Sequence, residues 1–320
     1  MVLRKKFRRV EDSAHEVNLS SDNSKENAVK KVSGVLLAFV FLSGAGMCFS
    51  LDRPLAFGLL EDHLNLVYSV SDGPATARFY GEVLGLEQMS GFDLPGGRQM
   101  LRYRGGESEL KFIVAGQERP QMEGGMHNAR GIRLLVLLLP VDRRAGIVER
   151  MQAAGIAVPE FTNDNSGPIS VSRGMTKDYD GNQVEIAFFS ETSGISVIDQ
   201  AQIGLAVSDM AAMGEFLQQV LALEPSKTQG TVHRYDIGKT QIKFWQAPAT
   251  SPAWVGRPHE KLGITMVQFV VADVYAARDI IVARGGKIHT QPYVLGDLAV
   301  VMFVEGPDGI LVEFGAALAK

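Results

Sequence analysis

Two lysines that could bind an anionic group recur at equivalent points of this chain. Lys111 and Lys243 each follow an Arg-Tyr pair at the same offset, Arg102-Tyr103 and Arg234-Tyr235. Ammonium and guanidinium groups bind carboxylates and phosphates, and arginine does so with a planar fork of donors. The recurrence has two interpretations: a duplicated ligand site, or surface strand residues that only record a duplication.

Two glutamates recur in the same way. Glu185 lies in KDYDGNQVEIAFF and Glu313 in EGPDGILVEFGAA, each in a strand that follows an Asp-Gly pair. An Asp-Gly pair predicts a tight turn, because glycine adopts a positive φ without strain. A lysine and a glutamate that point into one cavity would neutralise each other, so that neither charge is buried unpaired.

The elements that position these residues are themselves repeated. A strand-to-helix unit occurs as NLVYSVSDGPATARFYGEVLGLE from Asn65 and as QIGLAVSDMAAMGEFLQQVLALE from Gln202. Both predict an alternating strand, an aspartate that caps a helix, and an aromatic residue on the buried helix face. GIRLLVLLLPVD and GITMVQFVVADV predict buried strands, followed by helices over 143–154 and 275–284. Repeats on this scale define an architecture.

Together these signatures resemble the vicinal oxygen chelate superfamily, which includes glyoxalase I, extradiol dioxygenases and bleomycin-resistance proteins. The resemblance runs from about Asp62 to Ala317. It implies an α+β fold of four βαβββ modules, paired into two tandem glyoxalase-like domains, in which two modules build one cupped sheet. We place the modules at 62–116, 130–190, 200–248 and 262–317. The domains are then 62–190 and 198–318, joined by a short linker over 191–200.

The resemblance also implies where site residues lie, near the start of each module's first strand and in its last strand. Counting seven residues back from the capping aspartate gives the first-strand position. Module two has no aspartate in register, so its position is taken from an alignment with module four. Arg133 is the alternative in module two if that strand slips by one residue. The predicted sets are Asn65, Lys111, Leu134 and Glu185 in the first cup, and Gln202, Lys243, Met266 and Glu313 in the second. Neither set contains histidine, and a protonated lysine cannot ligate a metal. No cofactor is therefore favoured.

A metal site remains the alternative. His63 shares a strand face with Asn65, and Glu109 shares one with Lys111. His63, Glu109 and Glu185 could then hold Zn, Ni, Mn or Fe in the first cup, with Glu313 as the corresponding ligand in the second. The competing interpretation makes His63 a solvated residue at the strand entrance.

Charge-paired cups predict Lys111 beside Glu185 and Lys243 beside Glu313. Arg102, Arg234 and the paired tyrosines would line the cavities, and Trp245 would form a pocket floor or pack between domains. The predicted function is that of a glyoxalase/bleomycin-resistance-like protein that binds a small polar or anionic organic molecule. A metal-dependent enzyme, a lactoylglutathione lyase-like lyase or isomerase or a dioxygenase, is the alternative. A structural or interaction module is the third class.

Composition sets the remaining bounds. The 320 residues are 46% apolar and 21% charged, which is typical of globular domains. The net charge of −4 gives no reason to expect a nucleic-acid partner. A single cysteine, Cys48, excludes a disulfide framework. We expect a small-molecule ligand, domains paired within one chain, and a monomer or homodimer.

The N-terminal segment differs from the body. Residues 1–31 are polar and of mixed charge, which predicts a disordered tail. The apolar segment 32–50 suits a signal peptide or a membrane anchor, and its apolar core is short for a full span. The protein is therefore expected to be exported or tethered to a membrane, or cytoplasmic if this segment reflects a misassigned start.

Overall fold

The computed structural model describes residues 57–115, 119–121, 124–165, 170–190, 200–254 and 260–318. The fold below is that of the unit Ser50–Lys320, to which all of these residues belong. The predicted tail over 1–31 and the apolar segment over 32–50 lie outside the described residues. No helix among the described residues is long and apolar enough to cross a lipid bilayer.

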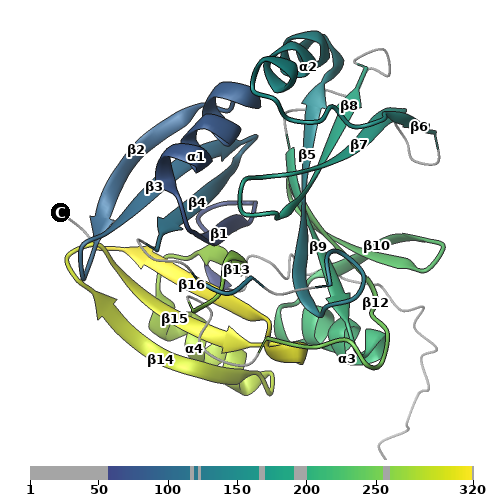
Figure 1. Cartoon of the computed structure of the whole chain (residues 1–320). Helices are drawn as coiled ribbons and strands as arrows, with labels where there is room; N and C mark the ends of the chain where they lie inside the picture. Colours follow the sequence, from purple (N-terminus) through teal and green to yellow (C-terminus); the bar gives the residue numbers. More distant parts are fainter. Residues whose placement is uncertain are drawn as a thin grey trace, which may run out of the picture. The chain divides into compact units, whose positions relative to one another are not determined.

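The described strands form two eight-stranded mixed sheets, which confirms the predicted α+β fold (Figure 1). Module one contributes β1 (Asn65–Val70), β2 (Gln88–Leu94), β3 (Arg98–Gly105) and β4 (Ser108–Val114). Module two contributes β5 (Gly131–Pro140), β6 (Thr162–Asp164), β7 (Val171–Lys177) and β8 (Gln183–Phe189). Module three contributes β9 (Gln200–Val207), β10 (Glu224–Gln229), β11 (Val232–Ile237) and β12 (Thr240–Gln246). Module four contributes β13 (Gly263–Val270), β14 (Lys287–Leu295), β15 (Ala299–Glu305) and β16 (Leu311–Ala317).

Each module carries one main helix. These helices are α1 (Gly73–Ala77), α2 (Arg144–Ala153), α3 (Met210–Glu215) and α4 (Val274–Ala283). The helices α1 and α3 continue as π-helical turns over Arg78–Val83 and Phe216–Val220, and short 3₁₀ turns cover Val141–Arg143 and Pro307–Gly309.

Aspartates begin three of the four helices, as predicted. The carboxylates of Asp72, Asp209 and Asp273 accept hydrogen bonds from amides in the first helical turn. These bonds satisfy donors that have no partner within the helix. In module two no side chain caps α2, because Asp142 lies inside the preceding 3₁₀ turn.

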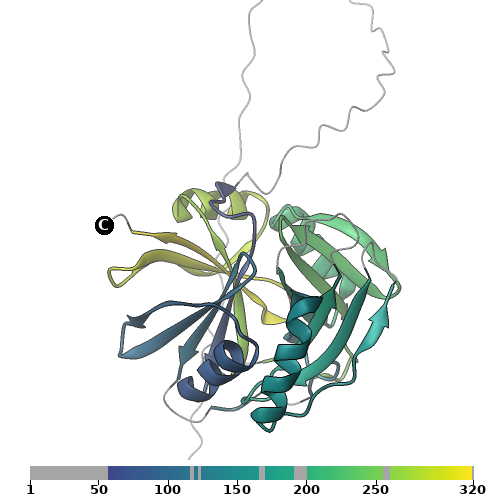
Figure 2. The same ribbon diagram turned by 90° about the horizontal axis from the view of Figure 1, so that it is seen from above.

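The modules pair in a different order from the one expected. Module one shares its sheet with module four, in the order β14-β15-β16-β13-β1-β4-β3-β2, and module two shares the other sheet with module three. At the centre of each sheet two first strands pair antiparallel, β1 with β13 and β5 with β9. We call modules one and four the outer modules, and modules two and three the inner modules. In Figure 2 the blue and yellow outer strands lie together, as do the teal and green inner strands.

This pairing corrects the expected grouping of modules one with two and three with four. The domain limits of 62–190 and 198–318 group modules that are consecutive in the chain. The sheets instead combine module one with module four and module two with module three. The expected linker 191–200 lies outside the described residues except for Gln200, where β9 begins, and the strands β8 and β9 that it connects lie in the same sheet. The chain crosses between sheets after β4 and again after β12. The first strand of a module exposes an edge that any other apolar first strand can cover, so chain order does not decide the partner.

The largest hydrophobic core contains buried side chains from both sheets and from the helices, among them Tyr68, Phe79, Leu137, Ile203 and Phe269. Alternate strand residues point away from this core. On that opposite side each sheet has a concave face, which we call the outer cup (modules one and four) and the inner cup (modules two and three).

Candidate functional site

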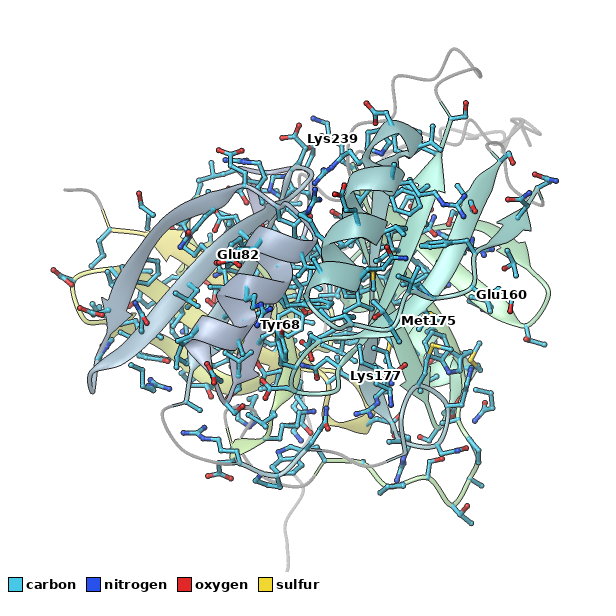
Figure 3. The ribbon with its side chains drawn as sticks, turned by 45° about the horizontal axis from the view of Figure 1, so that its top comes forward. Tyr68, Glu82, Glu160, Met175, Lys177 and Lys239 are labelled. Carbon is cyan, nitrogen blue, oxygen red and sulfur yellow. The ribbon has the colours of Figure 1, made fainter. Side chains whose placement is uncertain are left out.

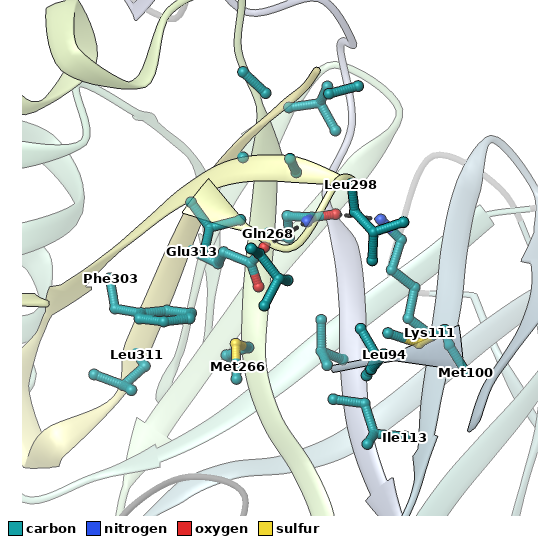
Figure 4. A pocket seen from close by; sticks show the side chains of 18 of the residues that line it. Leu94, Met100, Lys111, Ile113, Met266, Gln268, Leu298, Phe303, Leu311 and Glu313 are labelled. Atoms are coloured by element: carbon teal, nitrogen blue, oxygen red, sulfur yellow. Dashed lines mark hydrogen bonds between the residues drawn. The ribbon is translucent and has the colours of Figure 1, made fainter. Parts of the chain in front are cut away.

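The outer cup holds a cavity of about 680 Å³ (Figure 4). Its walls come from all eight strands of the outer sheet and from the loop before β15, and they are mainly apolar. The apolar lining includes Val67, Phe92, Leu94, Met100, Ile113, Met266, Leu298, Val301, Phe303 and Leu311. The volume lies within the range of small-molecule sites.

Polar side chains meet at the base of this cavity. Lys111 on β4 donates to the amide oxygen of Gln268 on β13, and the Gln268 amide nitrogen donates to Glu313 on β16 at 2.8 Å (Figure 4). Asn65 is buried beside them, with its Nδ2 at 3.4 Å from the Gln268 oxygen. Burial raises the pKa of the Glu313 carboxyl, although Lys111 and the Gln268 hydrogen bond act in the opposite direction.

A second group of charges lies on β3 and β4 beside the polar base. Arg102 binds Glu109 through Nε at 3.1 Å and Nη2 at 2.6 Å, and Lys111 Nζ lies 3.3 Å from Glu109. Burial would raise the pKa of Glu109, but the two cations outweigh it and lower that pKa. Arg98 also lines the cavity and makes no ion pair with any described residue.

The inner cup has the same plan with different contents. Glu185 on β8 lies between Arg173, which donates to one carboxylate oxygen, and Lys243, whose Nζ is 3.4 Å from the other. Burial lowers the pKa of Lys243 against the opposing effect of Glu185. Trp245 packs over Gly204, where an added Cβ would lie 2.7 Å from the indole ring.

Apolar side chains fill the rest of the inner cup. Trp245 packs with Leu134, Val136 and Phe189 in a buried cluster, and the His127 ring lies 5.8 Å from the indole ring between centroids. Among the residues that the structure describes, apolar side chains of this cluster fill the inner cup, whereas the outer cup is hollow. Of the two interpretations of Trp245, its burial in this cluster favours packing over a pocket floor.

The predicted site residues divide between the two cups. The outer cup brings together Asn65, Arg102, Lys111 and Glu313, and the inner cup brings together Glu185, Gln202, Arg234, Lys243 and Trp245. The expected pairs Lys111–Glu185 and Lys243–Glu313 do not form. Lys111 lies instead in the network of Glu313, and Lys243 pairs with Glu185, because the modules are exchanged between the sheets.

The pairing of the first strands brings further side chains to the centres of the two sheets. Gln268 pairs with Asn65, and Val136 pairs with Gln202. Gln268 also lies beside Glu313 on the parallel strand β16, and the expected residue Met266 lines the same cavity. Gln268 is the residue that the sequence reading missed. The sequence feature that could have identified Gln268 is its polar side chain in the otherwise apolar run MVQFVV.

The tyrosines of the two Arg-Tyr pairs do not line the cups. Arg102 pairs across the sheet with Lys111 and faces the cavity, so the next residue, Tyr103, points to the opposite side. Tyr103 and Tyr235 are both buried in the main hydrophobic core.

The alternative metal ligands do not come together. Glu185 lies in the inner sheet, whereas Glu109 and Glu313 lie in the outer one. His63 contacts Glu61 at 3.2 Å, and the carboxylates of Glu61 and Asp62 raise its pKa despite the opposing effect of burial. Within the described ranges, no three His, Cys, Asp or Glu side chains are placed to hold a metal ion.

The four outer-cup positions do not fit a metal ion either. Asn65 and Gln268 supply amides, Glu313 supplies one carboxylate, and Lys111 brings an ammonium group into the same set. The Gln268 oxygen that could ligate already accepts a hydrogen bond from Lys111. A cation here would meet a fixed positive charge.

Comparison with known proteins agrees with this architecture. Residues 199–314 match the model of the Glyoxalase/Bleomycin resistance protein/Dioxygenase superfamily. Glyoxalase I from Zea mays has a TM-score of 0.60 at 15% identity, covering 79% of this chain and 92% of that one. A "putative dioxygenase" from Bacillus subtilis has a TM-score of 0.58 at 17% identity, covering 82% and 86%. No curated protein matches the sequence significantly.

Residues 199–314 therefore belong to the glyoxalase/bleomycin resistance/dioxygenase, or vicinal oxygen chelate, superfamily, and the two solved structures share the fold of the chain. The matched residues include β13 and β16 of the outer sheet and β9–β12 of the inner sheet, so they contribute to both cups.

Proposed function

We propose that this protein binds a small organic molecule, with an apolar body and a polar or anionic group, in the outer cup. The observation that carries the proposal is the 680 Å³ cavity whose apolar walls end on Lys111, Gln268 and Glu313. Apolar walls with a few convergent polar groups are typical of ligand pockets, because the walls supply affinity and the polar groups fix orientation.

The Lys111 ammonium is the group best placed to recognise the polar end of the ligand. It has three donors, and among the described residues its contacts are with Gln268 and Glu109. One donor is therefore available for a carboxylate, sulfonate or carbonyl oxygen. Arg98, which also lines the cavity, would add a second positive charge near that oxygen.

A fluorescent amphipathic anion, 1-anilinonaphthalene-8-sulfonate, tests this proposal. Titration of the full chain should show one saturable site, and Lys111→Met should weaken the affinity about tenfold, the effect of losing one charge-assisted hydrogen bond. Lys243→Met is the matched control, because Lys243 holds the equivalent position in the filled inner cup. Equal weakening by both substitutions, or the absence of a saturable site in a folded protein, would overturn the proposal.

Elemental mass spectrometry tests the metal-dependent lyase, isomerase or dioxygenase alternative. The full chain is exposed in turn to Zn, Ni, Mn and Fe and then freed of loosely held ions. We expect no metal above background, because Lys111 occupies the donor set. About one tightly held ion per chain would contradict the binding-only proposal, and Glu313→Ala would then show whether the outer cup holds that ion.

A further inference from the structure

A second cavity, which shares no lining residue with the outer cup, lies where the two sheets meet. It has a volume of about 250 Å³ and lies between the starts of β5 and β13, the end of β7 and the turn that precedes β8. We call it the seam cavity. Three cationic side chains line it, Arg133, Lys177 and Lys261, together with the amide side chains of Gln121, Asn182 and Gln183.

Lys261 is the most unusual of these residues. It is only 8% exposed, and its ammonium makes no hydrogen bond or ion pair with any residue that the structure describes. Its one aromatic contact is with Trp254, whose ring centroid lies 5.8 Å away. An unpaired charge that is removed from water in this way is costly. Burial, aided by Arg133, lowers the pKa of Lys261 to about 8, so that at neutral pH most molecules still carry the charge.

The seam cavity offers this charge no carboxylate. Its described lining residues include neither aspartate nor glutamate. Arg133 adds a second cation from the inner sheet and directs its Nε to the carbonyl oxygen of Gly125 at 2.8 Å. Lys177, labelled in Figure 3, lines the cavity at the end of β7 and is itself exposed to solvent. Three positive charges and three amides therefore surround a space too small for a drug-sized ligand.

A related cavity on the other side of Lys261 shows how the fold can neutralise such charge. That cavity has a volume of about 260 Å³ and is lined by the Asp308-Gly309 turn and the start of β5, the counterparts of the Asp180-Gly181 turn and the start of β13. There Arg130 pairs with Asp308 at 2.8 Å, and Glu305 also lines the space. The cavity beside Asp308 therefore contains carboxylates of the protein itself, whereas the described residues that line the seam cavity include none.

We propose that the seam cavity binds a small multivalent oxyanion, such as inorganic phosphate or sulfate. A multivalent anion matches three cations better than chloride does, and both lysine and arginine bind tetrahedral oxyanions by charge-assisted hydrogen bonds. The anion would join Arg133 and Lys177 of the inner sheet to Lys261, which immediately precedes β13 of the outer sheet. Bound anion would therefore strengthen the contact between the two sheets.

Thermal unfolding and calorimetry of the full chain test this proposal. Sodium phosphate and sodium sulfate are each compared with sodium chloride at equal ionic strength. The expected result is a saturable rise in Tm of several degrees, because a ligand of the native state stabilises it by mass action, and one anion bound per chain by calorimetry. Lys261→Met should abolish the anion-dependent rise. It should leave Tm in chloride equal or higher, because it removes a buried charge that has no counter-ion among the described residues.

Two further variants complete the experiment. Lys177→Met, at the exposed end of the cavity, should weaken anion binding several-fold without affecting folding. Lys239→Met, which removes a surface pair with Glu107, should leave the anion response unchanged. A rise in Tm that persists in Lys261→Met would reveal general stabilisation by excluded salts and overturn the proposal. Calorimetry that detects no binding would also overturn it. Neither result would affect the outer-cup proposal.

Discussion

Ser71 donates two hydrogen bonds, from its backbone amide and its hydroxyl, to the carboxylate of Asp180, which lies 109 residues further along the chain. Ser208 and Asp308 repeat this contact, with both distances 2.7 Å. Each contact joins a serine before a helix cap to the Asp-Gly turn of the next module, and so joins one sheet to the other. The two repeated motifs of the sequence, the Ser-Asp helix start and the Asp-Gly turn, are therefore hydrogen-bonded to each other.

Asp180→Ala should destabilise the protein by about 1–3 kcal/mol, because two donors of Ser71 lose their acceptor. Asp308→Ala should cost more, since Arg130 also loses its partner at 2.8 Å. Urea unfolding at neutral pH measures both. Asp279→Ala is the control: its ion pair with the adjacent Arg278 is exposed and should be worth well under 1 kcal/mol.

Glu313→Gln should raise the affinity of the outer cup for anilinonaphthalenesulfonate several-fold at pH 7.5 or above. The substitution keeps a hydrogen-bonding side chain beside Gln268 but removes the negative charge near Lys111. Because burial raises the pKa of Glu313, acidification protonates this carboxyl, and parent affinity should rise as the pH falls. The variant should lack this pH dependence. An identical pH profile in both proteins would contradict the assignment of Glu313 to the binding site.

Trp245→Ala should create a second probe site in the inner cup. The indole lies over Gly204 and is only 9% exposed, so its removal leaves an apolar space. We expect a loss of stability of about 3–5 kcal/mol and a change from one bound probe per chain to two. Tyr275→Ala truncates an exposed aromatic residue and should change neither quantity. A stoichiometry that stays at one in a folded Trp245→Ala protein would show that the inner cup collapses.

Asp178→Asn should alter the pH dependence of stability. Asp178 accepts hydrogen bonds from Tyr80 Oη at 3.0 Å and from Asn182 at 2.8 Å, and burial raises its pKa from 3.8 to about 6. The folded protein thus holds this proton more tightly than the unfolded chain does. Stability should fall as the pH rises from about 4 to about 6, by roughly 3 kcal/mol from this group.

Urea unfolding of the parent and Asp178→Asn between pH 4 and pH 7 measures this effect. The difference in unfolding free energy, variant minus parent, should increase with pH, because the neutral amide does not lose a proton. A constant difference would mean that Asp178 keeps an ordinary pKa in the folded protein.

The sequence predicted the local features of this fold well. Aspartate caps at Asp72 and Asp273 and glycine-containing turns at Gly181 and Gly309 are specified by hydrogen bonds and backbone conformations within a few residues. Alternation along β4 placed Glu109 and Lys111 on one face correctly. Such features need no knowledge of distant parts of the chain.

The partners of the site residues could not be predicted in the same way. Lys111 meets the network of Glu313 rather than Glu185 because β1 pairs with β13, and four similar apolar first strands carry no local mark of their partners. Gln268 reaches this network because β13 pairs with β1 on one side and with β16 on the other, which places it beside Asn65 and Glu313. A count along one strand does not identify such neighbours.

The nesting of one pair of modules inside the other sets an order for assembly during synthesis. Val136 and Gln202, paired at the centre of the inner sheet, are close in sequence, whereas Asn65 and Gln268 of the outer sheet are 203 residues apart. Closing the longer loop costs more entropy and slows folding. A nascent chain that has reached β12 holds every strand of the inner sheet but only half of the outer cup. The apolar wall of β1–β4 then stays uncovered until β13–β16 have been synthesised.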